Sequence, residues 1–478
     1  MKILVLLFLF IRFWEVCYAA DLPSCKNFWK ALKSSERTWK SSENYGKYYQ
    51  KLKRSGCEKE WTILVYMQAD NNLTPYAYWD LYEMESAFKR QLNGSTLKTD
   101  VIVQVDTRDS QVVSRLHMFQ SPRAYKQLSL QDVEKKTLDD FYSPIVQQIA
   151  ENKLPKEQRQ HFSDFLQWGM KRYPAKNTMV ILWGHGQGWT ASQAVQFGGI
   201  AIDDTQKTRL SIPDIRQGLS GHKIDVLATD ACLMQTVEVI YELADVSDYI
   251  IGSSQIQNFL GFPYRRLLYE INSGGYLGLK KQYPRAASSY LVAKMLPQLF
   301  KQSFDTARGL QGRIDPSGIK QLTMSSFNTQ EFKNYLIPEL KKMSAVLLEY
   351  VLQNPFAKVA IKSLLQSMPR FLGGSRDLST LIGRLEERLR LDFSNVQHAI
   401  NRAVVGHAYG EDYLSFAIEG IAAHDDLYYY AEYFKALAIW QPISRKNFKR
   451  YRKNFLETRF YKETRWNLWT EQIYPGAL

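Results

Sequence analysis

The 478-residue chain lacks the features that mark several large classes of protein. Its 26 glycines and 16 prolines form no repeat, which excludes collagen-like and low-complexity proteins. Its seven histidines are scattered, and neither an HExxH nor a CxxC motif occurs, so a zinc centre is not expected. A GxSxG motif is also absent, which argues against an esterase of the α/β-hydrolase type.

Long apolar runs are absent except at residues 1–20, MKILVLLFLFIRFWEVCYAA. This run begins with a lysine in its first residues and ends in two alanines, as secretory signals do. Arg12 and Glu15 interrupt it, so an uncleaved membrane anchor is the weaker interpretation. We therefore expect an exported protein. The stretch LPSC, which ends at Cys25, is a poor match to a lipoprotein site because of its proline and the preceding Asp21.

Cysteine is scarce, with four in the whole chain. Cys17 leaves with the signal, and Cys25 and Cys57 flank a polar leader, residues 21–58, that is a candidate pro-segment. These two thiols could pair in an oxidising compartment, but the sequence does not decide whether they do. Cys232 then has no cysteine to pair with, so it is either an inert residue packed in the core or a reactive thiol.

Positive charge is abundant, with a formal net charge of +14 and a pI of about 9.3. Such a charge favours anionic partners in general, yet a solvated basic surface is common in exported proteins, and no specific nucleic-acid site is expected. The segment SRKNFKRYRKNF (444–455) interleaves basic and aromatic residues. It is typical of an amphipathic helix whose aromatic side chains pack inward; the alternative is docking to an anionic surface.

Apolar segments alternate with helical patterns through the first half of the chain, which predicts an α/β fold with a mainly parallel sheet covered on both faces. We expect strands at 61–70, 100–107, 115–119, 178–183, 224–229 and 249–255, helices at 80–92, 156–173, 212–219 and 233–246, and a hairpin at 197–204. From about residue 286 the pattern is mostly helical, with one strand-like stretch at 413–420. We therefore divide the chain into a catalytic-type domain, 59–285, and a mostly helical C-terminal subdomain, 286–478.

Two of the predicted strands lead into loops that suit nucleophilic catalysis. The strand 178–183 is followed by Gly184-His185-Gly186, and the strand 224–229 by Asp230-Ala231-Cys232. Reactive groups gather at the carboxyl ends of parallel strands, so His185 is expected beside Cys232 as its base. A helix that begins directly after Cys232 would also lower the pKa of the thiol.

The sequence resembles the clostripain family of cysteine peptidases in several separate blocks. These blocks are WTILVYMQADNNLTPYAYWDLYEME, ILWGHGQGW, GGIAIDDT, DVLATDACLMQTVEVIYELADVSDYIIGSSQ and FPY, in the family's order and spacing over about residues 59–270. The resemblance implies a caspase-like fold and a peptide hydrolase. It implies that Cys232 is the nucleophile and His185 the general acid and base, with the backbone amides of Gly186 and Cys232 binding the oxyanion.

The resemblance also implies a specificity pocket and a processing site. Asp230 would lie at the floor of the pocket and select Arg or Lys in the substrate, although a role as a helix cap is the alternative. Relatives tend to carry acids where this chain has Gln255 followed by IQNFLGFPY. The resemblance therefore implies a pocket with one charge fewer and more apolar walls, which argues against strict specificity for basic residues. No Lys or Arg occurs from Gly186 to Gln206, so Lys207 and Arg209 are the first candidates for self-cleavage.

The chemistry itself requires no cofactor, and calcium is the only ion considered. Asp203 and Asp204 carry hard carboxylate ligands and relatives can depend on that ion, although two adjacent acids are more often a turn. The main hypothesis is an exported, monomeric cysteine endopeptidase that acts on proteins or peptides and cleaves bonds after Arg or Lys. The rival is a catalytically silent protein of the same fold that binds a partner through its basic C-terminal region.

Overall fold

The structure is a computed structural model that describes residues 58–86, 94–96, 98–121, 129–189, 198–274, 286–305, 320–371, 374–411, 434–442 and 444–474. The expected signal at 1–20, the leader cysteines Cys25 and Cys57, and the strand at 413–420 lie outside these residues. Among the described residues, no helix has both the length and the apolar character needed to cross a bilayer.

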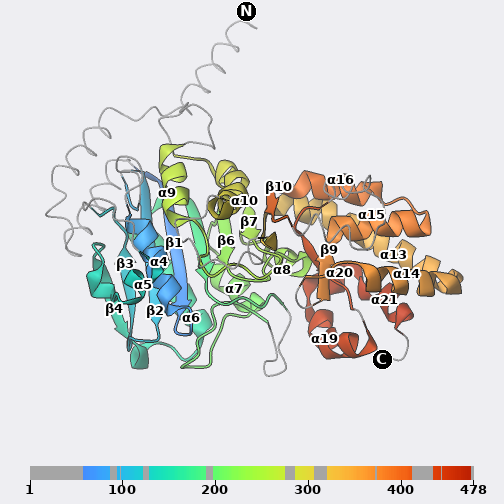
Figure 1. Cartoon of the computed structure of the whole chain (residues 1–478), viewed down its shortest axis with the longest axis horizontal. Coiled ribbons are helices and arrows are strands. Elements are labelled where there is room, and N and C mark those ends of the chain that lie inside the picture. Colours follow the sequence, from blue (N-terminus) through green and yellow to red (C-terminus); the bar gives the residue numbers. More distant parts are fainter. Residues whose placement is uncertain are drawn as a thin grey trace, which may run out of the picture.

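Nine strands form one sheet in the spatial order β10-β8-β7-β6-β5-β1-β2-β3-β4 (Figure 1). The strands are β1 (Lys59–Ala69), β2 (Thr99–Thr107), β3 (Val112–His117), β4 (Ile145–Ala150), β5 (Ala175–Trp183), β6 (Val226–Asp230), β7 (Tyr249–Gly252), β8 (Thr323–Asn328) and β10 (Val404–Tyr409). The five central strands, from β7 to β2, run parallel, and two antiparallel strands flank them on each side. The expected caspase-like α/β class, with its mainly parallel sheet, is confirmed.

Burial on both faces explains why the central strands form a parallel sheet. All nine residues of β2 and all five of β6 are buried, as apolar runs between two helix layers should be. One face carries α4 (Thr74–Glu85), α9 (Tyr264–Ser273) and α10 (Ser289–Asp305), and the other carries α6 (Gln158–Arg172), α7 (Ile212–Leu219) and α8 (Val237–Leu243). Side chains alternate along β1, so that Leu64 packs on the second layer and Val65 on the first.

Three elements beyond residue 285 belong to the sheet region. Helix α10 covers one face, and β8 and β10 extend the edge that lies next to the C-terminal helices (Figure 1). The sequence interpretation missed both strands because TMSSFN and VVGHAY are short and carry neither a long apolar run nor a clean alternation. The nine-stranded sheet is therefore not contained within residues 59–285.

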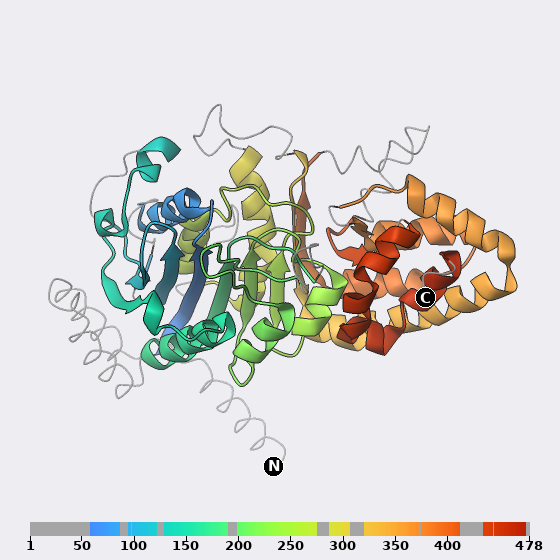
Figure 2. The same cartoon turned by 90° about the horizontal axis from the view of Figure 1, so that it is seen from below.

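The remaining C-terminal elements form a helical body beside the sheet, shown in orange to red in Figure 2. Its members are α13 (Ile337–Gln353), α14 (Pro355–Ser367), α15 (Leu378–Leu389), α16 (Ser394–Ala403), α19 (Arg445–Glu457), α20 (Arg459–Thr464), α21 (Asn467–Ile473) and the short pair β9 (Ser375–Asp377) and β11 (Ala438–Trp440). Their apolar residues join those of α6, α7 and α8 in one continuous core. The mostly helical C-terminal part is thus confirmed, and it is packed on the sheet domain.

Candidate active site

Two adjacent strands bring the predicted catalytic loops to the same edge of the sheet. β5 and β6 pair in parallel with Trp183 opposite Asp230, and both strands end there. The amide of Gly184 donates to the carbonyl oxygen of Asp230 at 3.3 Å. The residues that follow, Gly184-His185-Gly186 and Asp230-Ala231-Cys232, therefore leave the sheet side by side.

Gly186 is the point where the two loops meet. A Cβ atom placed on Gly186 would lie 3.0 Å from the amide nitrogen of Cys232 and 2.9 Å from the Cβ of Ala231, and closer still to the carbonyl oxygen of Cys232. Only glycine permits this approach. Leu233 directly follows Cys232 and has a φ of 62°, a left-handed conformation that is strained for a branched side chain. The thiol is thus presented on a tight, strained turn.

The thiol of Cys232 is half-buried and its hydrogen bond comes from the opposite loop. The amide of Gln257 donates to Cys232 Sγ at 3.2 Å. Burial raises the pKa of the thiol, and the negative charge of Asp230 adds to that, while the Gln257 hydrogen bond acts in the other direction. The expectation of a thiol pKa lowered by a helix is wrong, because α8 begins only at Val237, with Thr236 as its cap.

The imidazole of His185 is held by an asparagine that follows β1. His185 Nε2 lies 2.6 Å from Oδ1 of Asn72. Because a carboxamide oxygen only accepts, the proton of this bond is on Nε2, which leaves Nδ1 free to take a proton. Burial lowers the pKa of His185, partly offset by the charge of Asp204. Among the described residues, no hydrogen bond joins the ring to the thiol, and the pKa shifts of both groups favour their neutral forms.

Asp230 is buried beneath the loop that follows β7. Its carboxylate accepts hydrogen bonds from the amide of Phe262 at 2.9 Å, the hydroxyl of Tyr264 at 2.9 Å and the side-chain amide of Gln257. It does not cap α8, so the alternative interpretation of this acid is wrong. Gln257 thus contacts both Asp230 and Cys232 and covers the space between them.

The wall of this site carries the apolar side chains expected from IQNFLGFPY. Ile256 is 53% exposed and Phe259 is 55% exposed, and the Phe259 ring stacks on Tyr76 with 5.1 Å between centroids. Gln255 lies in the same loop, and its backbone oxygen accepts from the amide of Leu233. Exposed aromatic and aliphatic groups next to a thiol can hold the apolar parts of a peptide.

The loop between His185 and Cys232 holds the remaining predicted residues. The backbones of Ile200 and Leu210 hydrogen-bond to each other and hold together the two sides of the turn at residues 201–209. Lys207 is exposed in this turn and has a φ of 57°. Arg209 is half-buried on the returning arm. The adjacent acids point apart: Asp203 is buried, whereas Asp204 is exposed and pairs with Arg108 at 3.2 Å.

Two residues of the site were missed by the sequence interpretation, Asn72 and Gln257. Both follow strands of the parallel core, β1 and β7, at the edge where the catalytic loops lie. The same rule that located His185 and Cys232 could therefore have found them.

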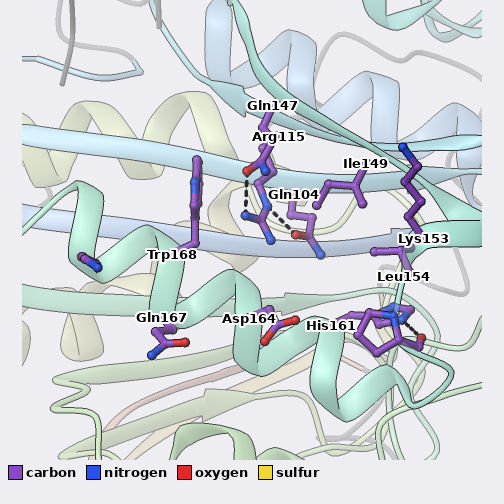
Figure 3. A pocket seen from close by; sticks show the side chains of 12 residues that line it. Gln104, Arg115, Gln147, Ile149, Lys153, Leu154, His161, Asp164, Gln167 and Trp168 are labelled. Atoms are coloured by element: carbon purple, nitrogen blue, oxygen red, sulfur yellow. Dashed lines mark hydrogen bonds between the residues drawn. The ribbon is translucent and has the colours of Figure 1, made fainter. Parts of the chain in front are cut away.

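A cavity of about 430 Å³ lies away from these loops, between α6 and the strands β2, β3 and β4 (Figure 3). Arg115 is buried there, bonded to Gln104 and Gln147 and 4.5 Å above the ring of Trp168. Burial lowers the pKa of Arg115 to about 10, so it stays charged at neutral pH. No predicted catalytic residue lines this cavity.

Comparison with known proteins agrees with this geometry. The model of the clostripain family matches residues 65–283, which span both loops and the end of β1 that precedes Asn72. This part of the chain is similar to the clostripain family. Clostripain from Hathewaya histolytica is 25% identical over 233 residues, which cover 45% of this chain and 42% of that relative. The match thus spans less than half the length of that clostripain.

Two solved structures share the fold of this chain. One is a secreted C11 cysteine protease from Bacteroides thetaiotaomicron in complex with an irreversible peptide inhibitor, with a TM-score of 0.55, 18% identity and coverage of 85% of this chain and 99% of that one. The other is an inactive zymogen C11 protease from Parabacteroides distasonis, with a TM-score of 0.55, 16% identity and coverage of 85% and 98%. Both alignments extend well beyond residues 65–283, so the fold similarity includes much of the C-terminal part.

Proposed function

We propose that this chain is an exported cysteine endopeptidase in which Cys232 attacks the peptide carbonyl and His185 moves the proton. The observation that carries the proposal is the contact of the two loops at Gly186, on adjacent parallel strands of a clostripain-family domain. Because the thiol and the imidazole are both neutral, the histidine acts first as a base.

The reaction follows from that starting state. The thiol proton passes to His185, the sulfur bonds to the carbonyl carbon, and the imidazolium then protonates the departing amine as the C–N bond breaks. Water, deprotonated by the same histidine, hydrolyses the resulting thioester. The amides of Gly186 and Cys232 donate to no backbone oxygen within the described residues, although the Cys232 amide interacts with its own thiol. Both amides would turn to the oxyanion when it forms. Such donors contribute roughly 3–4 kcal/mol each.

Specificity for Arg or Lys rests on Asp230. Its buried carboxylate is already bonded to three neutral donors, and a substrate guanidinium or ammonium would replace the amide of Gln257. An uncharged substrate residue would leave the carboxylate without that charge-assisted bond. The substitution Asp230→Asn should therefore abolish the preference for Arg and Lys reporter peptides over Leu reporters. Equal turnover of basic and Leu reporters by the unmodified enzyme would remove the assignment.

Export and self-cleavage complete the proposal. Residues 1–20 supply the signal, and the structurally similar protease from Bacteroides thetaiotaomicron is described as secreted. Cleavage after Lys207 is favoured over cleavage after Arg209, because the turn at Lys207 is exposed. Intact mass of the purified active protein tests this: two fragments separating at residue 207 are expected, and one intact active chain would contradict it.

A single labelling experiment separates the enzyme from a silent binding protein. A peptide chloromethyl ketone with a terminal lysine should label the protein at one site and abolish cleavage of a Lys reporter. The variant Cys232→Ala should lose both the label and the activity. Cleavage that persists in Cys232→Ala would refute the nucleophile, and an unlabelled, inactive wild-type protein would favour the binding role.

A further inference from the structure

The cavity of about 430 Å³ between α6 and the strands β2, β3 and β4 is built around a buried cation (Figure 3). Arg115 of β3 lines it and is 4% exposed. Gln104 of β2 and Gln147 of β4 lie beside Arg115, and Asp164 and Trp168 belong to the wall formed by α6. We call this space the Arg115 cavity, and none of its lining residues takes part in the proposed peptidase reaction.

The contacts of Arg115 leave much of its hydrogen-bonding capacity unused. Nε donates to Oε1 of Gln104 at 2.8 Å, and Nη1 donates to Oε1 of Gln147 at 2.9 Å. A guanidinium has five N–H groups, so three of them have no acceptor among the described residues. Nη2, the guanidinium nitrogen without a dashed line in Figure 3, is the one that makes neither of these bonds.

No carboxylate of the described residues neutralises Arg115, since none of their ion pairs includes it. Asp164 accepts instead from the side-chain amide of Gln160 at 2.7 Å. Burial lowers the pKa of Arg115 to about 10, which still leaves it charged at neutral pH. A buried charge is normally paired, so the expected partner is an anion that enters the cavity.

The rest of the lining is also cationic. Lys153, in the short helix η2 (Glu151–Lys153), and Lys171 of α6 line the cavity and are exposed. His161 adds no charge at neutral pH, because burial lowers its pKa. Asp164 is the one acid in this lining, so three cationic side chains face a single carboxylate and the cavity carries two positive charges in excess.

The two glutamines add neutral donors. The side-chain oxygens of Gln104 and Gln147 accept from Arg115, and their side-chain nitrogens donate to no acceptor among the described residues. Gln104 is 4% exposed, so its carboxamide is buried together with the guanidinium. The strand wall thus presents N–H groups from three adjacent side chains, which is the chemistry that recognises an oxyanion.

We propose that the Arg115 cavity binds a small dianionic oxyanion, of the class of phosphate and phosphate monoesters. Arg115 and the carboxamides of Gln104 and Gln147 would donate to its oxygens, and Lys153 and Lys171 would add positive charge at the rim. The excess of two positive charges matches the charge of about −1.5 to −2 that a phosphate monoester carries at pH 7.

The alternative is a purely structural Arg115 that ties β3 to its two neighbouring strands through Gln104 and Gln147. That role makes no use of Lys153 and Lys171, which form neither a hydrogen bond nor an ion pair among the described residues. The two lysines therefore distinguish a ligand site from a structural arginine.

Binding is measured on the full-length protein in Hepes-buffered NaCl. Sodium phosphate at pH 7.5 should bind at one site by isothermal titration calorimetry and raise Tm by at least about 2 °C over NaCl of equal ionic strength. Sodium sulfate, a dianion of the same shape, should raise Tm similarly, and the monoanion acetate clearly less. Absence of binding and of a Tm shift with phosphate and sulfate would overturn the proposal, and an equal shift with acetate would overturn the preference for dianions.

Variants at the rim locate the anion. Lys153→Ala and Lys171→Ala each remove one charge from the cavity and should weaken phosphate affinity by about 5-fold or more. Lys176→Ala is the matched control, because it removes an exposed lysine of β5 outside the cavity and should keep the affinity. Unchanged affinity in both rim variants, or an equal loss in Lys176→Ala, would reject the site. A general stabilising effect of these salts would likewise leave the Tm shift of the rim variants unchanged.

Two further variants test the centre of the site and its independence from catalysis. Arg115→Gln should lower phosphate affinity by at least about 10-fold, and the rim variants decide the question if it does not fold. Cys232→Ala should bind phosphate as the wild type does. Loss of binding in Cys232→Ala would place the anion at the catalytic loops and reject the Arg115 cavity, whereas binding by a protein without peptidase activity would refute only the proposed function.

Discussion

At the scale of single residues, the site consists of groups whose protonation is set by burial. Both members of the proposed dyad are shifted toward their neutral forms: the pKa of Cys232 is raised and that of His185 is lowered, in each case mainly by desolvation. These shifts favour the neutral thiol and imidazole over a thiolate–imidazolium pair. Proton transfer has to accompany the attack on the substrate.

The neutral pair predicts a defined pH dependence. The base form of His185 is required, so kcat/KM should fall as pH drops through the lowered pKa of the free enzyme, that is, below the ordinary histidine value of about 6.5. It should stay level up to the raised thiol pKa. Initial rates with a Lys reporter from pH 4.5 to 9 check this, and an acid limb above pH 7 would contradict it.

Asn72 gives a second prediction at this scale. Replacing it with Ala frees the ring and should lower kcat by up to about 100-fold, with little change in KM. Asn72→Asp keeps an acceptor but adds a negative charge, which stabilises the imidazolium. This variant should move the acid limb of the pH profile to higher pH. A role in folding alone would lower the amount of soluble protein without moving the limb.

At the scale of elements, the site depends on loops that continue strands, and the sequence located these loops well. Buried apolar runs marked β1, β2, β5 and β6, and α7 occupies the expected residues 212–219. The helix expected at 233–246 is shorter because the turn after Cys232 occupies residues 231–236. Nothing in ACLMQT signals the left-handed Leu233, since that conformation is imposed by contacts from other loops.

Because the two catalytic loops touch at Gly186, we expect activity to be very sensitive to a side chain at this position. Gly186→Ala should push the two loops apart and lower kcat/KM by about 100-fold or more, while the far-ultraviolet circular dichroism stays unchanged. The control is Gly383→Ala within α15, where an added Cβ meets nothing within 4 Å. That variant should keep its activity and gain up to about 1 kcal/mol of stability from helix propensity. Equal activities of the two variants would contradict the loop contact.

At the scale of the whole molecule, the basic residues of 444–455 form one side of an amphipathic helix, α19. Phe448 and Phe455 are buried and contact Trp440, whereas Arg445, Lys446, Lys449, Arg450 and Lys453 are exposed. The inward packing of the aromatic residues was expected from the sequence. Whether the exposed side docks to an anionic surface stays a prediction.

That docking is testable with vesicles. The protein should co-sediment with phosphatidylserine vesicles at low salt, and binding should fall steeply between 50 and 300 mM NaCl because the attraction is screened, as the Debye length of about 10 Å at 0.1 M requires. The double variant Lys449→Glu, Lys453→Glu should weaken binding without changing Tm. Binding that ignores salt would count against the idea.

Contacts far apart in the sequence were beyond prediction from one chain. The hydrogen bonds of Asp230 to residues 257–264 follow no local pattern, because they are made between loops that continue different strands. Strands β8 and β10, beyond residue 285, were missed for a similar reason, since their place in the sheet is set by pairing with distant strands and not by a pattern of their own.

Trp189, three residues past Gly186, is wedged against Trp440 and Phe455, with ring centroids 5.4 and 5.3 Å away. The backbone of Ala438 also bonds to Gln235, just beyond the nucleophile loop. Ala438, Trp440 and Phe455 of the C-terminal part therefore support the loops that carry His185 and Cys232. A truncated protein made for expression should therefore extend through residue 474. A fragment that ends at residue 283, where the family match ends, would lose the side chains of Trp440 and Phe455 that pack on Trp189, close to His185 in the chain.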